Sequence, residues 1–189
     1  MTTILAKTLS EVKSRKDYFI REALRADLDI IQEIYAHHVK NGLGSFEELA
    51  PQSKEVQKRI TQARSLNLPY LVAELNSSVK GFAYVSPFRH RSAYRYTLED
   101  SVYVAPESLG IGIGSALLSN LIMKCTALGF RQMIAVIGDS KNQASINLHL
   151  KYGFSHIGIM PSVGFKFGRW VDSVRMQRPL GQGDKTTPN

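Results

Sequence analysis

Apolar residues recur every three or four positions in four stretches of the chain, a spacing that predicts amphipathic helices. The first helix is expected after Asp27, the second from Ser53 to just before Pro69, and the third up to Gly129. Asp and Ser favour helix starts because their oxygens accept from free backbone N–H groups, and glycine ends a helix readily. A fourth helix is expected over residues 142–152.

Between these helices the chain is rich in β-branched and aromatic residues, which favour strands. A hairpin is expected across "NSS", and the continuously apolar run "MIAVI" is typical of a parallel strand buried on both faces. The expected strands are "DYFIREAL", "YLVAEL", "VKGFAYV", "YRYTLEDSVYV", "MIAVI", a strand from Phe154, and "RWVDSVRMQRPL". This order predicts an α/β fold with a mixed, mostly antiparallel sheet that contains one parallel strand–helix–strand unit.

The composition fits one globular domain. The chain has 189 residues, 43% of them hydrophobic and 21% charged, and no apolar run reaches the ~18 residues of a membrane span. We place the domain at residues 18–180, with a mobile extension over 1–17 and a disordered tail over 181–189. Cys125 is the only cysteine, so neither a disulfide framework nor a thiolate metal site is expected, and a reducing, cytoplasmic location is favoured.

The charge balance is basic. Lys and Arg number 24 against 16 Asp and Glu, which gives a formal net charge of +8. This excess suits an anionic ligand and, on charge alone, a nucleic acid. Because the sequence has no DNA-reading motif and no basic tract interleaved with aromatics, we expect neither a nucleic-acid nor a membrane partner and interpret most of the excess as solvated surface.

Three glycines at alternate positions, Gly110, Gly112 and Gly114, precede the third helix. A dinucleotide-binding fingerprint does not fit, because its third glycine would fall on Ser115 or Leu117, and the Gly-Lys-Ser/Thr of a P-loop is absent. Two interpretations remain. The loop is either a turn without a ligand or a cradle whose backbone N–H groups, unshielded by Cβ, bind a pyrophosphate at the positive end of the helix.

The glycine loop and its surroundings resemble the GNAT family of N-acetyltransferases. That family carries Gln/Arg-x-x-Gly-x-Gly/Ala after its fourth strand, and residues 109–114 match the two glycines, with Leu109 in place of Gln or Arg. The segment "ASINLHLKYGF" resembles the next motif of the family, with Asn142 at the Asn position and His149 at the Tyr position. The blocks "PFRHRSAYRYTLEDSVYV", "PYLVAE" and "GFKFGRWVD" resemble the phosphinothricin and methionine-sulfoximine acetyltransferase branch, and the likeness runs from about residue 20 to residue 180.

The resemblance implies a GNAT-type fold, acetyl-CoA as the cofactor, and a homodimer. Leu109 removes one polar side chain from the loop and leaves the backbone cradle in place. Asn142 has two compatible uses, a hydrogen bond to the pantetheine arm and a helix cap. The residues that the resemblance places at the cofactor are Val102, Tyr103, Val104, Gly110, Ile111, Gly112, Ile113, Gly114, Ser115 and Asn142.

Acetyl transfer to an amine needs a base for the amine and a proton for the departing thiolate. The branch has its proposed base at Glu99, in an apolar strand where desolvation would raise the pKa of a carboxyl; an ion pair with a nearby arginine is the alternative. Asp100 is expected on the opposite strand face, so we choose Glu99. His149 could supply the proton because imidazole titrates near neutral pH, and the alternative is a buried core histidine.

The segment "PFRHRSAYRYT" gathers arginines and tyrosines just before Glu99. Arginine forks suit carboxylate or phosphinate oxygens, whereas the alternative is a basic, solvent-facing hairpin. On the resemblance, some acceptor residues lie across a dimer interface. The expected acceptor-site residues are Phe46, Arg91, Ser92, Ala93, Tyr94, Lys166 and Trp170.

We therefore expect an N-acetyltransferase that uses acetyl-CoA to acetylate the α-amine of a small amino acid or analogue of the phosphinothricin, methionine sulfoximine or sulfone type. Attack is direct, with Glu99 as base and His149 as acid, and Cys125 in a helix core is a poor nucleophile. One alternative is the same chemistry on a polyamine or a protein N-terminus. The other is a regulatory module that binds coenzyme A without turnover.

Overall fold

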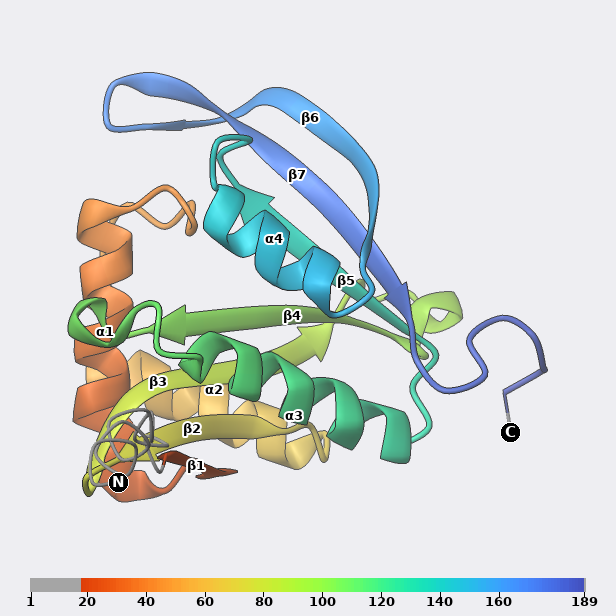
Figure 1. Cartoon of the computed structure of the whole chain (residues 1–189), viewed down its shortest axis with the longest axis horizontal. Coiled ribbons are helices and arrows are strands. Elements are labelled where there is room, and N and C mark those ends of the chain that lie inside the picture. The colour runs from red at the N-terminus through yellow and green to blue at the C-terminus, as the bar shows by residue number, and fades with distance from the viewer. Residues whose placement is uncertain (1–17, 189) are drawn as a thin grey trace, which may run out of the picture.

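The computed structural model describes residues 18–188, and the extension expected over 1–17 lies outside this part of the chain. One seven-stranded sheet runs through the molecule in the order β1-β2-β3-β4-β5-β7-β6 (Figure 1). Only the β4–β5 pair is parallel, so the predicted mixed, mostly antiparallel sheet is confirmed. The strands are β1 (Tyr18–Glu22), β2 (Tyr70–Leu75), β3 (Ser78–Pro87), β4 (Thr97–Val104), β5 (Gln132–Gly138), β6 (Ser155–Lys166) and β7 (Arg169–Pro179).

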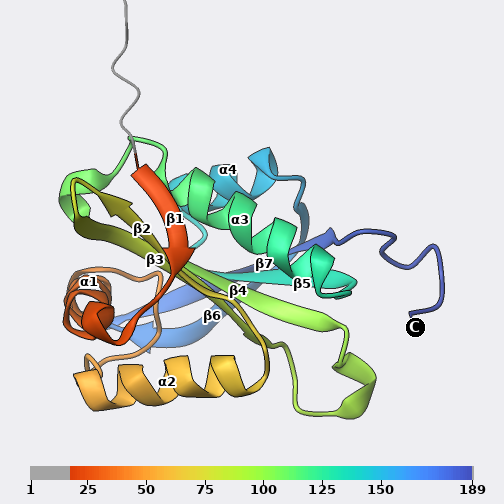
Figure 2. The same ribbon diagram turned by 90° about the horizontal axis from the view of Figure 1, so that it is seen from below.

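Helices cover both faces of the sheet. Figure 2 shows α1 and α2 on one side and α3 and α4 on the other. Their bounds agree with the predicted helices to within a few residues. The helices are α1 (Leu28–Asn41), α2 (Ser53–Ser65), α3 (Ile113–Ala127) and α4 (Gln143–Lys151). None of the helices in the described part of the chain is both long and apolar enough to cross a bilayer.

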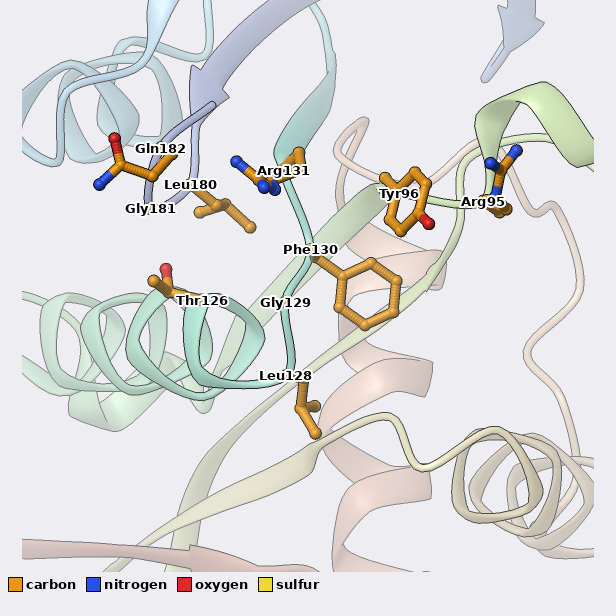
Figure 3. Close-up of a pocket in the computed structure, with 10 residues that line it drawn as sticks. All are labelled: Arg95, Tyr96, Thr126, Leu128, Gly129, Phe130, Arg131, Leu180, Gly181 and Gln182. Atoms are coloured by element: carbon orange, nitrogen blue, oxygen red, sulfur yellow. The ribbon is translucent and has the colours of Figure 1, made fainter. Parts of the chain in front are cut away.

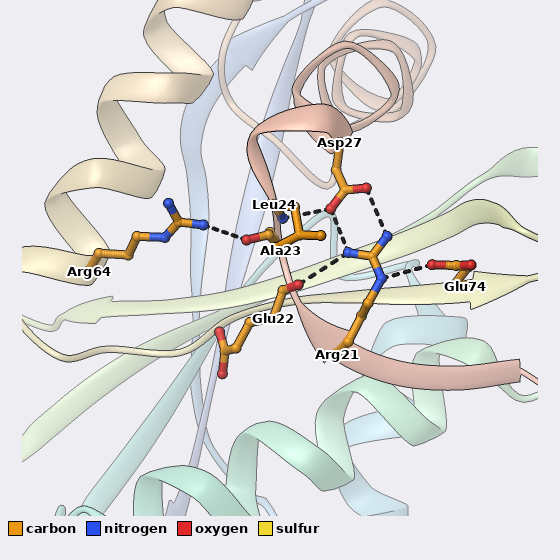
Figure 4. Close-up of polar contacts among 7 residues, drawn as sticks. All are labelled: Arg21, Glu22, Ala23, Leu24, Asp27, Arg64 and Glu74. Carbon is orange, nitrogen blue, oxygen red and sulfur yellow. Dashed lines mark hydrogen bonds and ion pairs between the residues drawn. The ribbon is translucent and has the colours of Figure 1, made fainter.

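The start of α1 lies where the sequence predicts it, but the Asp27 side chain makes different hydrogen bonds from the expected helix cap. Asp27 holds the N-cap position, yet its carboxylate does not cap α1. The carboxylate instead accepts from the backbone N–H of Leu24 at 2.7 Å and from the Arg21 guanidinium at 2.7 and 2.9 Å. Arg21 also donates to Glu74 at 2.7 Å, so one guanidinium ties β1 to β2 and to the chain entering α1 (Figure 4).

The apolar face of α3 packs on β3 and β4. Its buried residues are spaced as the sequence predicts, and they include Cys125, which has no exposed surface. Burial, with a smaller effect from the charge of Asp100, raises the pKa of the Cys125 thiol to about 12. The thiol is therefore protonated and inaccessible, which confirms its predicted place in the core.

The parallel strands separate partway along their length. β4 pairs with β5 only from Thr97 to Asp100, opposite residues 132–135. Beyond Asp100, β4 stays bonded to β3 as far as Val104, while β5 stays bonded to β7 as far as Gly138. The two strands thus diverge from Asp100 onward and leave a V-shaped opening between them.

The composition predicted disorder for the segment 181–188. In the structure this segment forms turns beside the start of β5. Arg131 donates to the carbonyls of Gly183 at 3.3 Å and Thr187 at 3.2 Å and to the hydroxyl of Thr186 at 3.0 Å. These contacts join residues more than 50 positions apart, and local composition does not report them.

Candidate active site

A cleft of about 570 Å³ lies where β4 and β5 diverge. The start of α3 and one face of α4 form its walls, and α1 contributes His38. All the predicted cofactor residues except Ile111, which packs against the core, line the cleft. The lining consists of His38, Gly44, residues 100–104, 108–110, 112–115 and 135–138, Asn142, Ala144, Ser145, Leu148, His149 and Lys151.

The glycine loop at one end of the cleft has the conformation of an anion cradle. Gly110 and Gly112 have φ values of +75° and +96°, which side chains other than glycine rarely tolerate. A Cβ on Gly110 would meet nothing within 4 Å, whereas one on Gly112 would lie 3.0 Å from the Tyr18 hydroxyl. No side chain in the described residues caps α3, so its first N–H groups remain available to an anion.

Two polar side chains extend the cradle toward α4. Asn142 caps α4 through its Oδ1, which accepts from the backbone N–H of Ser145 at 3.2 Å, and it also lines the cleft. The Lys151 ammonium lies 3.4 Å from the Ser115 hydroxyl and places a positive charge beside the loop. The sequence analysis missed Lys151, because residues two apart on a helix point to different sides and the predicted place of His149 therefore gave no signal for it.

His38 contacts the end of β4. Its Nε2 lies 2.8 Å from the carbonyl oxygen of Val104. Burial lowers the pKa of His38, partly offset by this bond, so the neutral ring donates from Nε2 to the carbonyl. His38 thereby fixes the strand end beside the glycine loop, a role that its place on the apolar face of α1 did not reveal.

His149 and Asp100 form a buried pair in the wall of the cleft, where β4 separates from β5. His149 is 3% exposed and Asp100 6%, and Nε2 of the ring lies 3.0 Å from Oδ2 of the carboxylate. The other ring nitrogen, Nδ1, lies 2.7 Å from the carbonyl oxygen of Ser145. Burial opposes a charged ring, but the hydrogen bond and charge of Asp100 outweigh it and raise the pKa of His149.

Glu99 lies on the opposite face of β4. The β3–β4 register has no shift, so Glu99 shares a face with Tyr103, whose ring lies 4.9 Å from that of Tyr35 on α1. Burial raises the pKa of Glu99, as does the charge of Asp100, while the charges of Arg175 and Arg89 lower it. A carboxylate on one face and a histidine on the other therefore flank the point where the strands diverge.

Residues 20–175 match the family model described as an acetyltransferase (GNAT) domain. The chain belongs to the GNAT acetyltransferase family. It is 52% identical to the phosphinothricin N-acetyltransferase of Alcaligenes faecalis over 162 residues, covering 86% of this chain and 82% of that protein. It is 39% identical to the L-methionine sulfoximine/L-methionine sulfone acetyltransferase of Salmonella typhimurium over 163 residues, covering 86% of this chain and 95% of that protein.

The fold of this acetyltransferase matches that of a solved relative. The crystal structure of a GNAT superfamily phosphinothricin acetyltransferase from Sinorhizobium meliloti, in complex with AcCoA, superposes with a TM-score of 0.88 at 48% identity, covering 91% of this chain and 93% of that one. The protein is accordingly an N-acetyltransferase that uses acetyl-CoA.

The residues of the cleft fit this cofactor. The uncapped helix start and the open side of Gly110 suit its pyrophosphate, and the Lys151 ammonium adds a matching charge. The diverging strands leave backbone of β4 beyond Asp100 without a partner in β5, which suits the amides of a pantetheine arm. From Asp100 to Val104 the strand spans about 13 Å at roughly 3.3 Å per residue.

The predicted acceptor residues are not brought together in one chain. Arg91 directly precedes an exposed 3₁₀ turn (Ser92–Tyr94) that lies just before Thr97, and Thr97 pairs with the first residue of β5. Phe46 instead packs beside Gly164 and Gly138, the last residue of β5, and Trp170 is 64% exposed at the β6–β7 tip. The two groups therefore lie at opposite ends of β5.

The ammonium of Lys166 is buried and hydrogen-bonded to the protein backbone, whereas binding an acceptor would need an accessible ammonium. Lys166 is 2% exposed and donates to the carbonyls of Gly42 at 3.0 Å and Ser45 at 2.7 Å. Its visible role is to hold the α1–α2 loop, which includes Phe46 and the cleft residue Gly44. The sequence offered no signal for this pairing because the partners are backbone groups 121 and 124 positions away.

A second hollow, of about 540 Å³, lies beyond the other end of α3 (Figure 3). Its wall includes Thr126, Leu128 and Gly129 at the helix C-terminus, where backbone carbonyls disfavour an anion. The Arg131 guanidinium there is bonded to the tail segment. The cleft at the glycine loop therefore fits the cofactor better than this hollow does.

Proposed function

We propose that this acetyltransferase acetylates the α-amine of a small amino acid or analogue, of the kind represented by phosphinothricin, methionine sulfoximine and methionine sulfone. The observation that carries the proposal is the half-buried carboxylate of Glu99 at the point where the strands diverge, with Arg175 and Arg89 near enough for their charges to lower its pKa. The acceptors printed in the names of the relatives have the same chemistry, an α-amine beside an acid group.

In the proposed reaction, acetyl-CoA supplies an activated acetyl group as a thioester. Glu99 accepts the proton of the attacking amine, directly or through one water, and His149 supplies a proton from the other face of β4. Cys125 takes no part, because a buried thiol with a pKa of about 12 is a poor nucleophile. Attack by the amine on the thioester is therefore direct.

The acid group of the acceptor is assigned to the arginines of the segment before Glu99, Arg89 and Arg91, of which Arg89 is near enough to act on the pKa of Glu99. Arg91 directly precedes the 3₁₀ turn of Ser92, Ala93 and Tyr94, and the Tyr94 ring packs edge-on against Phe88 at 5.7 Å. Guanidinium forks bind carboxylate and phosphinate oxygens with two parallel hydrogen bonds, which lysine does not match. A polycationic acceptor such as spermidine would be repelled there.

We also propose that the enzyme is a homodimer in which the second copy completes the acceptor pocket. β6 is an edge strand, and it carries with β7 a row of apolar side chains, each at least 43% exposed, which edge strands normally avoid. The row consists of Ile157, Ile159, Met160, Val163, Phe165 and Trp170. A second copy on this row would bring a β6–β7 tip toward residues that lie apart within one chain. Sedimentation equilibrium should give a dimer, and a monomer at assay concentrations would contradict the proposal.

The proposed location is the cytoplasm, because the one cysteine is a free thiol and acetyl-CoA is supplied there. A fluorescent fusion of the enzyme tests the location in cells. Fluorescence in a secretory compartment would contradict the cytoplasmic location.

An acceptor panel tests the reaction. Release of free thiol from acetyl-CoA is measured with phosphinothricin, methionine sulfone, spermidine and a short peptide with a free N-terminus. The amino-acid analogues should give the highest kcat/KM, and Arg91→Ala should raise the acceptor KM more than the acetyl-CoA KM. Preference for spermidine or the peptide would reassign the acceptor, and acetyl-CoA binding without thiol release for any amine would favour the regulatory module.

A further inference from the structure

The two ring nitrogens of His149 are both engaged by protein acceptors. Nδ1 lies 2.7 Å from a backbone carbonyl, that of Ser145, and a carbonyl can only accept a hydrogen bond. Nδ1 therefore carries a hydrogen in every protonation state of the ring. The tautomer of the neutral ring is fixed by this one contact.

Because Nδ1 is always protonated, Nε2 of a neutral ring would present a lone pair to the carboxylate oxygen 3.0 Å away. Two lone pairs at this distance repel, so one further proton must lie between Nε2 and Oδ2 of Asp100. The resting pair consequently holds one more proton than a neutral histidine beside a free carboxylate.

Among residues 18–188, His149 is the only hydrogen-bond donor to the Asp100 carboxylate. Its second oxygen, Oδ1, is buried and has no hydrogen-bond partner among residues 18–188. Three titratable groups surround the pair. Glu99, the neighbouring residue on β4, has its pKa raised by burial and by the charge of Asp100, and Cys125 on α3 is protonated and feels the same charge. Lys151 on α4 has its ammonium turned to Ser115. His149 is thus the one cation in contact with the buried carboxylate within the described chain.

The pair also occupies a particular place in the cleft. Asp100 is the last residue of β4 that pairs with β5, and both members of the pair line the cleft at the end away from the glycine loop. With the pyrophosphate at that loop, the thioester end of the cofactor would lie toward Asp100 and His149. A stored proton at this end is well placed for the leaving sulfur.

We propose that Asp100 is a positioning residue that keeps His149 protonated until the thiolate departs. The inference rests on the proposed role of His149 as the acid. When the carbon–sulfur bond of the thioester breaks, its electron pair passes to sulfur, and the sulfur takes the proton between Nε2 and Oδ2. This leaves a neutral ring still bonded to Ser145 and an Asp100 carboxylate, and water then restores the proton. The proton lost by the amine goes to Glu99 and from there to water.

The proposal is tested by the alkaline limb of kcat. With acetyl-CoA and acceptor saturating, wild-type kcat should fall only above the raised pKa of His149. Asp100→Asn keeps the shape and removes the charge, so the limb should move to lower pH by at least about one unit, since an adjacent opposite charge shifts a pKa by roughly 1–3 units. The acetyl-CoA KM should change less than about threefold, because Asp100 acts through His149.

Asp27→Asn is the matched control. Asp27 is also 6% exposed and ion-paired, but its partner is Arg21 at the far edge of the sheet (Figure 4). It should lower stability and leave the alkaline limb in place. An Asp100→Asn enzyme that also keeps the wild-type limb would overturn the proposal and reduce the pair to a structural contact.

Nuclear magnetic resonance gives a readout that does not depend on turnover or on the folding of the variant. In wild-type protein labelled with ¹⁵N-histidine, both nitrogens of His149 should remain protonated at pH values where exposed histidines are neutral. A ring with an unprotonated Nε2 at neutral pH would overturn the proposal. If instead both nitrogens are protonated but His149→Gln keeps wild-type kcat, the acid assignment fails, and with it the catalytic role of Asp100.

Discussion

Replacing Lys166 with Met distinguishes an anchor of the α1–α2 loop from an acceptor contact. The ammonium donates to the carbonyls of Gly42 and Ser45, and the residue is 2% exposed. Met has a similar length and keeps the apolar stem, but it leaves both carbonyls without this donor. The substitution therefore removes two hydrogen bonds with little change in packing.

The magnitude follows from those two bonds. A hydrogen bond from a charged donor contributes about 1.5 to 3 kcal/mol, which gives roughly 3 to 6 kcal/mol for the pair. Burial of the ammonium opposes this, as the lowered pKa of Lys166 indicates despite the charges of Glu47 and Glu48, and Met removes that penalty. We expect a net loss of about 2 to 4 kcal/mol in the free energy of unfolding.

The assay is urea unfolding at neutral pH, in which the midpoint should fall while the slope stays unchanged. Lys151→Met is the control. Its exposed ammonium has only a 3.4 Å contact with the Ser115 hydroxyl and a 5.7 Å approach to the Tyr152 ring among the described residues, so stability should change by less than about 0.5 kcal/mol. Wild-type stability in Lys166→Met together with a raised acceptor KM would refute the anchor and restore Lys166 to acceptor binding.

Two further predictions concern the cradle and the β1 edge. Gly112→Val should abolish the rise in melting temperature that acetyl-CoA gives, because a side chain at φ +96° is strained and its Cβ would press on the Tyr18 hydroxyl at 3.0 Å; an undiminished rise would mean that the loop is only a turn. Asp27→Asn should lower the free energy of unfolding by about 1 to 3 kcal/mol at neutral pH. The hydrogen bond from Arg21 lowers the pKa of Asp27 in the folded state, so this stabilisation is present above the unfolded-state pKa and is lost as the pH falls through the folded one. The two proteins should therefore converge in acid, and a gap independent of pH would contradict the ion pair.

Local sequence patterns predicted the helices and strands and part of the candidate site. The remaining features depend on contacts between residues that are far apart in the sequence. The helix spacing placed Cys125 in the core, and strand alternation placed Glu99 and Asp100 on opposite faces, as the contacts of Tyr103 and His149 show. The same alternation led us to choose Glu99 over Asp100. The contact between Asp100 and His149 could not be predicted from this pattern, because the two residues are 49 positions apart in the chain. The contacts of Lys166 could not be predicted for a similar reason, since its partners are backbone carbonyls that leave no trace in the sequence.

The role of Glu99 is the central claim, and kcat of Glu99→Gln against pH tests it most directly. A positioned base contributes about 10² to 10⁴ in rate, or roughly 3 to 5 kcal/mol of barrier.

The account predicts a fall in kcat of about a hundredfold or more with acetyl-CoA affinity nearly unchanged. The acid limb set by the raised pKa of Glu99 should vanish, and the remaining rate should climb with pH, as the amine loses its own proton, until His149 deprotonates above its raised pKa. A Glu99→Gln enzyme that turns over at the wild-type rate, whether or not it melts at a lower temperature, would contradict the account.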